Sequence, residues 1–208
     1  MRRSGFAFLA AVIVACDNSA QIAGRIEATA NVQAHEAVDH THTLKVEWAT
    51  LDGFQAVINN AHLIVHGRVV AQRTVPGPVA KAPPRTVSTI AVEAVARAAR
   101  QGASSIEGGD VAPGSTIEID QLGGLLDDGC VIEPRESPVL RAAEEGIFLL
   151  SSDQIRGGRG GAYHVLGGFQ GRLAVRQGIV QPVVAGSTMG QRYHGRPVGD
   201  VIAELKGL

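Results

Sequence analysis

The chain has 208 residues, of which 45% are hydrophobic, so it is long enough for one domain with a sizeable core. Its 26 glycines argue against a long-helix bundle or a coiled coil, because the mobile glycine backbone destabilises helix interiors. The formal net charge of −1 excludes a globally basic nucleic-acid-binding protein.

The N-terminal residues have the pattern of an export signal. Two arginines follow Met1, and residues 6–15 form an uninterrupted apolar run that ends directly before Cys16. Such a run is too short to span a bilayer, which needs about 20 apolar residues. A small residue followed by Cys16 resembles the lipobox of bacterial lipoproteins, which implies that Cys16 is diacylated and becomes the mature N-terminus. We therefore expect residues 1–15 to be a signal peptide; an ordinary cleaved signal and an uncleaved anchor are the alternatives.

Residues 16–44 are polar and contain few large apolar side chains. This composition predicts a lipidated N-terminus with a flexible tether, and it places the folded domain in residues 45–208. The tether carries His35, His40 and His42. Because imidazole suits zinc or copper, a metal site on these three histidines is one hypothesis. The alternative is that they are solvated and bind no metal.

The domain is predicted to begin with a helix and two long strands. Apolar residues at helical spacing predict a short helix over residues 50–61. Runs rich in β-branched residues predict strands over residues 62–75 and 85–97. Gly67 lies inside the first strand, where a glycine indicates a bulge or a sharp bend.

The remaining elements are predicted to be short strands between glycine-rich turns. Residues 115–122 alternate between apolar and polar side chains, which is typical of a half-buried strand. An acidic segment follows in residues 123–144, and Gln177-Gly178 indicates a tight hairpin. Further strands are expected over residues 146–150, 163–166, 172–176 and 179–184, and a helix over residues 197–206. The predicted fold class is mainly β: an OB-like, partly open antiparallel barrel of five or six strands, with one short helix before the sheet and one at the C-terminus.

The succession of segments also resembles a known family. It is carried by AHLIVHGRVV (61–70), PGSTIEI (113–119), EGIFLL (145–150) and GFQGR (168–172). Together they look like a group of uncharacterised bacterial exported proteins, whose core is similar to the OB-like barrel of netrin-type and metalloproteinase-inhibitor domains. The resemblance covers roughly residues 45–206 and implies the fold. It does not carry over the inhibitory residues, since those inhibitors begin with a cysteine whose free amine meets the protease metal, whereas Cys16 is expected to be acylated.

Charged residues are divided unevenly along the domain. Residues 101–153 hold eleven acids and two arginines, whereas residues 154–199 hold six arginines and no acid or lysine. One interpretation is that neighbouring strands neutralise each other. The other is an arginine face for anionic partners such as lipid head groups or wall polymers. The candidate anion-binding residues are Arg156, Arg159, Arg172, Arg176, Arg192 and Arg196.

Catalytic motifs are not evident in the sequence. Ser187 stands at the wrong position for a G-x-S-x-G nucleophile elbow. Cys130 follows two aspartates, whose negative field would disfavour a reactive thiolate. His62 and His66 share one face of their predicted strand but lie about 13 Å apart at roughly 3.3 Å per residue. One ion therefore cannot reach both, unless the bend at Gly67 changes this geometry.

These observations predict an exported, membrane-tethered binding or interaction module without catalytic activity, facing the periplasm or the exterior. Its expected partners are the membrane, through the lipid anchor, and an anionic surface or an exported protein. Nucleic acid is not expected, because single strands are bound by stacking aromatics and few lie in the arginine-rich region. No cofactor is expected, apart from zinc or copper on the tether histidines. The alternative functions are a netrin-like protease inhibitor and a metal-handling protein.

Overall fold

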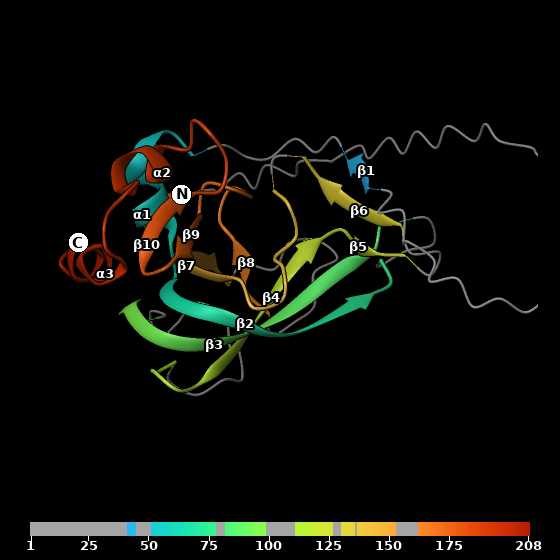
Figure 1. Cartoon of the computed structure of the whole chain (residues 1–208), viewed down its shortest axis with the longest axis horizontal. Coiled ribbons are helices and arrows are strands. Elements are labelled where there is room, and N and C mark those ends of the chain that lie inside the picture. Colours follow the sequence, from blue (N-terminus) through green and yellow to red (C-terminus); the bar gives the residue numbers. More distant parts are fainter. Residues whose placement is uncertain are drawn as a thin grey trace, which may run out of the picture.

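The computed structural model describes residues 41–44, 51–77, 82–98, 111–126, 130–135, 137–152 and 162–208. Within these ranges the protein is mainly β, with a seven-stranded sheet, a three-stranded sheet and three short helices. Figure 1 shows the helices at one end of the molecule and the three-stranded sheet at the other. None of the described helices is long and apolar enough to cross a membrane.

The large sheet is built around a long hairpin. Strand β2 (Leu63–Val75) pairs with β3 (Arg85–Arg97) on one side and with β7 (Glu145–Ser151) on the other, all antiparallel. The bounds of β2 and β3 agree with the sequence prediction to within one residue. The sheet order is β10-β9-β7-β2-β3-β4, where β4 is Thr116–Leu122, β9 is Arg172–Arg176 and β10 is Ile179–Pro182.

The sheet curls toward a barrel but is not closed by a continuous ladder in the described residues. The short strand β8 (His164–Val165) pairs with β7. Directly before it, Tyr163 forms a single parallel bridge with Ile119 of β4. This bridge is the link between the two sides of the curled sheet. The predicted fold class, a mainly β and partly open antiparallel arrangement with short helices, is confirmed.

Apolar side chains cover both faces of the sheet. Because successive side chains point to opposite faces of a strand, Leu63 and Val65 of β2 pack inside the curl with Phe148 and Tyr163. Ile64 points to the other face and joins the core beneath the helices. The residues of β7 divide in the same way, so these two strands are buried on both sides.

The helices cover one end of the outer face. Helix α1 (Gly53–Asn60) and helix α3 (Val198–Lys206) occur where the sequence predicts helices, and α3 contacts β3. Helix α2 (Thr188–Tyr193) was not predicted from the sequence. Its N-cap is Ser187, whose Oγ accepts a hydrogen bond from the backbone N–H of Gly190.

The small sheet consists of β1 (Thr41–Leu44), β6 (Val131–Pro134) and β5 (Gly124–Leu125). Its first strand occupies the last four residues of the segment predicted as a tether, and it pairs in parallel with β6. The acidic segment 123–144, for which no strand was predicted, supplies the other two strands. Strand β6 therefore depends on a partner that is distant in the sequence, and β5 depends on β6.

Candidate functional site

One group of described residues combines ligand types that metal ions use. His66, Glu93 and Glu145 each offer one ligand atom, and these atoms lie within 4.8 Å of one another. The three residues come from three adjacent strands, β2, β3 and β7. We call this group, together with Arg68 of β2, the His66 cluster.

A β-bulge places Glu93 beside the other members of the cluster. His66 of β2 pairs with Ala94 of β3, and Gly67 of β2 pairs with Val92 of β3. Glu93 is therefore an extra residue of β3 between these two pairs. Such bulges redirect side chains. Gly67 allows the backbone of β3 to approach β2 closely at the bulge, since a Cβ atom at Gly67 would lie 2.5 Å from the carbonyl oxygen of Ala91. The bulge indicated by Gly67 in the sequence is thus confirmed.

The imidazole of His66 lies between the two carboxylates. Its Nε2 is 3.0 Å from Glu145 Oε1, and its Nδ1 is 3.5 Å from Glu93 Oε2. Arg68 contacts both carboxylates as well, with Nη2 at 2.5 Å from Glu145 Oε2 and Nε at 3.6 Å from Glu93 Oε1. The side chain of His66 is only 10% exposed, whereas that of Arg68 is 46% exposed. The cluster thus has a nearly buried imidazole and a more exposed guanidinium, each in contact with both carboxylates.

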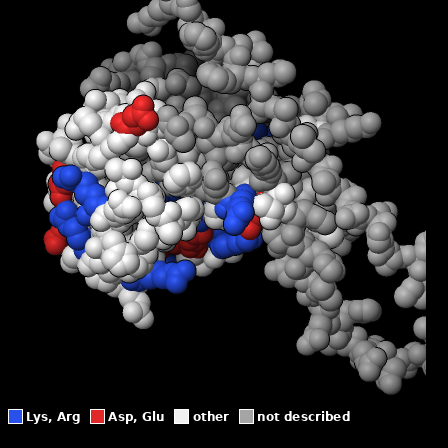
Figure 2. Space-filling model, turned by 90° about the horizontal axis from the view of Figure 1, so that it is seen from above, with Lys and Arg blue, Asp and Glu red and all other residues white. Residues whose placement is uncertain are grey.

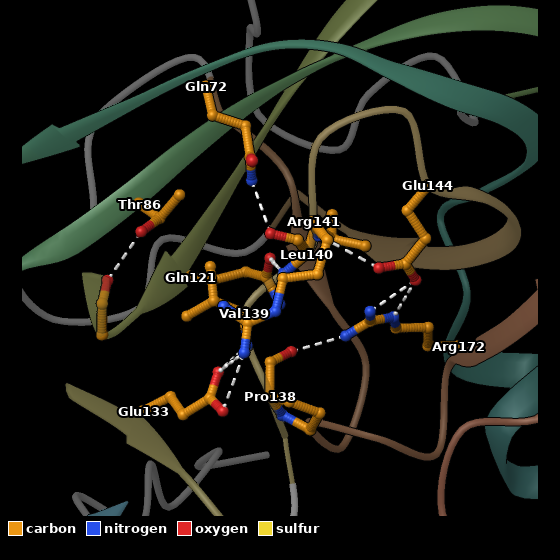
Figure 3. A network of polar contacts seen from close by, with 11 residues as sticks. Gln72, Thr86, Gln121, Glu133, Pro138, Val139, Leu140, Arg141, Glu144 and Arg172 are labelled. Atoms are coloured by element: carbon orange, nitrogen blue, oxygen red, sulfur yellow. Dashed lines mark hydrogen bonds and ion pairs between the residues drawn. The ribbon is translucent and has the colours of Figure 1, made fainter. Parts of the chain in front are cut away.

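Arg172, a candidate anion-binding residue, lies in an internal network (Figure 3). Its Nε and Nη2 donate to Oε1 of Glu144, at 3.1 and 2.5 Å, and its Nη1 donates to the carbonyl of Pro138 at 2.5 Å. The side chain is 5% exposed. Because Glu144 belongs to the acidic part of the sequence, this pair matches the neutralisation interpretation. Its guanidinium is directed to the segment before β7 and away from solvent.

The same network connects residues 137–144, the segment before β7, to the large sheet. Glu144 also accepts from the backbone N–H of Arg141, Gln121 accepts from that of Leu140, and Gln72 donates to the carbonyl of Leu140 (Figure 3). These contacts replace regular pairing, because residues 137–140 form no strand. The order of this segment therefore depends on side chains of β2, β4 and β9.

Three other candidate arginines lie on the described surface. Arg176 is exposed at the end of β9. Arg192 and Arg196 both bind Glu204 of α3, at 2.8 and 2.6 Å. Arg192 also lies over the ring of Phe54 of α1, 4.3 Å from its centroid. In Figure 2, the basic side chains lie beside acidic ones at several places and do not merge into one basic patch.

Glu204 makes the contact among the helices dependent on pH. Hydrogen bonds from Arg196 and then Arg192 lower the pKa of Glu204 from 4.5 to about 2. A carboxylate whose folded-state pKa is depressed stabilises the protein above its unfolded pKa, and this contribution disappears as the pH falls through the folded value. We therefore expect Glu204→Gln to destabilise the protein near neutral pH. In urea titrations, the difference from wild type should shrink as the pH falls from about 4.5 toward 2; a pH-independent difference would contradict this account.

Two further histidines have structural contacts. Nδ1 of His62 accepts from both the hydroxyl and the backbone N–H of Ser152, at 2.8 and 3.1 Å. Nδ1 of His164 donates to the carbonyl of Asp120 at 3.1 Å, and burial lowers the pKa of His164. His62, which directly precedes β2, and His66 of β2 thus contact different partners.

Several candidate residues lie outside the described residues: Cys16, His35, His40, Arg156 and Arg159. His42 belongs to β1, but its side chain is not among those described. Of the three possible metal ligands, only His66 was named from the sequence; Glu93 and Glu145 were missed. The glycine-marked bulge is the one local signal that pointed to this place.

No family model, curated protein or solved structure matches this chain significantly.

Proposed function

We propose that this chain is an exported binding module without catalytic activity, held at a membrane by a lipid on Cys16 and facing the periplasm or the exterior. The observation that carries the proposal is the N-terminal pattern of two arginines, an apolar run and then Cys16. Diacylation of Cys16 would give stable attachment, because a single acyl chain binds membranes only marginally.

The arrangement of the domain supports a binding role at the end that carries the helices. The first described residues, Thr41–Leu44, belong to the small sheet, and the helices lie at the opposite end (Figure 1). Arg192 and Arg196 are partly exposed there and share the single carboxylate of Glu204. Two guanidinium groups against one carboxylate suit an anionic partner.

The contacts of Ser187 and Ser152 disfavour a nucleophilic role for these two described serines. Ser187 caps α2 through its Oγ. The hydroxyl of Ser152 contacts Nδ1 of His62, and this nitrogen already accepts a hydrogen bond from the backbone N–H of Ser152. That nitrogen has one lone pair, so the amide competes with any transfer of the hydroxyl proton to it.

Metabolic labelling with a fatty-acid analogue tests the anchor in the full chain expressed in a bacterium. We expect wild type to carry the label and to partition into the detergent phase of a phase-separating detergent. Cys16→Ser should lose both properties. Cys130→Ser is the matched control and should keep both. A wild-type chain in the aqueous phase without label would overturn the proposed anchor, and turnover of an ester or peptide substrate that Ser152→Ala abolishes would overturn the non-catalytic assignment.

A further inference from the structure

We propose that His66, Glu93 and Glu145 bind a divalent transition-metal ion such as Zn²⁺, and that Arg68 occupies the place of this cation when the ion is absent. The inference does not rest on the lipid anchor. It concerns a site in the folded domain that is separate from the histidines of the tether.

The ligand set and its spacing suit such an ion. Zn²⁺ is bound by imidazole nitrogen and carboxylate oxygen at about 2.0–2.2 Å, which places neighbouring ligands of a tetrahedral site about 3.4 Å apart. The three ligand atoms already lie within 4.8 Å of one another. Because Nε2 of His66 faces Glu145 and Nδ1 faces Glu93, the ion would bind one ring nitrogen, and the carboxylate beside the other nitrogen would have to turn toward the ion. Three protein ligands leave a fourth position for water or for a group from a partner.

The backbone holds the ligands on a rigid frame. Strand β2 lies between β3 and β7 with paired backbone on both sides, and the bulge at Glu93 turns that carboxylate toward His66. The imidazole is nearly buried and Glu145 is 17% exposed, whereas Glu93 is 42% exposed. Two ligands are thus held in place by packing, and the third can move to complete the coordination.

Arg68 shows that this position attracts a cation. Its guanidinium bridges Glu93 and Glu145 on the solvent side of the cluster. A divalent ion would supply twice that charge and bind both carboxylates directly. Because the side chain of Arg68 is 46% exposed, it can turn into solvent when the ion binds. Arg68 and the metal ion therefore compete for the same two carboxylates.

This competition distinguishes a metal site from a structural ion-pair cluster. When Arg68 is removed, Zn²⁺ no longer has to break its two partly exposed ion pairs with Glu93 and Glu145, and such exposed pairs are weak. We expect Arg68→Ala to strengthen Zn²⁺ binding by about threefold to tenfold. A purely structural cluster predicts lower stability and no gain in affinity for Zn²⁺.

The test is titration of the full chain, purified in detergent without a histidine tag, with Zn²⁺ in competition with a chelating dye. All variants are made in a chain that has His35, His40 and His42 replaced by alanine, so that zinc on the tether does not contribute. We expect one Zn²⁺ per chain, and an affinity at least about tenfold weaker for His66→Ala and Glu145→Gln. Glu145→Gln keeps the size of the side chain, and circular dichroism reports whether each variant is folded.

Arg73→Ala is the matched control, because Arg73 lies on the same strand and forms an exposed pair with Glu118 at 2.7 Å. It should leave the affinity for Zn²⁺ unchanged. The proposal is overturned if folded His66→Ala and Glu145→Gln bind Zn²⁺ as tightly as their parent, or if Arg68→Ala weakens binding. These outcomes leave the fatty-acid labelling of Cys16 unaffected, so failure of the metal site and failure of the anchor are distinguishable.

Discussion

Replacing Arg85 by methionine is expected to lower the free energy of unfolding by about 3 to 5 kcal/mol. Arg85 lies at the start of β3, and its Nε donates to both carboxylate oxygens of Asp120 on β4, at 2.8 and 3.0 Å. The side chain of Arg85 is 10% exposed and that of Asp120 is 0% exposed. Removing the guanidinium takes from a buried carboxylate its ion pair with Arg85, which costs far more than the loss of a surface pair.

Urea denaturation at neutral pH measures this effect. Arg73→Met is the matched control, since Arg73 of β2 forms an exposed pair with Glu118 of β4, the strand that also carries Asp120, and it should cost less than about 1 kcal/mol. The double variant Arg85→Met with Asp120→Leu should recover most of the stability, because neither charge of this buried pair then remains. A loss of less than about 1 kcal/mol for Arg85→Met alone would show that the pair is not important for stability.

Arg172→Met is expected to cost about 2 to 4 kcal/mol. The variant loses two hydrogen bonds to Glu144 and one to the carbonyl of Pro138. The expected loss is smaller than for Arg85, because Glu144 is 18% exposed and water can solvate its charge in part. The variant should also free residues 137–144, which depend on this network for their position (Figure 3).

Denaturation and amide hydrogen exchange together check the second effect. Faster exchange should be confined to the segment before β7, in particular to Arg141, whose backbone N–H donates to Glu144. Arg176→Met is the control on the same strand; Arg176 is exposed, and its replacement should change the stability by less than about 0.5 kcal/mol. Equal effects of the two substitutions would contradict an anchoring function for Arg172.

Local patterns were sufficient to predict most elements. The β-branched runs predicted β2 and β3, and the Gln177-Gly178 turn is confirmed, with positive φ at both residues and the antiparallel pair β9–β10 around it. Helix α2 was missed because it has only six residues, which is too short for a clear apolar period. The strands β5 and β6 were missed for a similar reason.

The candidate site was accessible from the sequence only in part. His66 and Gly67 were noticed, but Glu145 lies 79 positions from His66 in the chain. Asp120 shows the same limit: the alternation over residues 115–122 predicted a half-buried strand, whereas the polar side chain of Asp120 is 0% exposed and paired with Arg85. Alternation predicts which residues share a face, but it does not predict what covers that face.

The sequence by itself determined the strands of the seven-stranded sheet, helices α1 and α3 and the bulge at Gly67, because these depend on backbone preferences and on the period of neighbouring side chains. Only the tertiary structure decided which charges meet. Arg172 pairs with Glu144, and Glu93 and Glu145 converge on His66, because strand register and the curl of the sheet bring together residues far apart in the chain. Electrostatic and coordination interactions act over a few ångströms in space, so they follow the fold and not the order of the sequence.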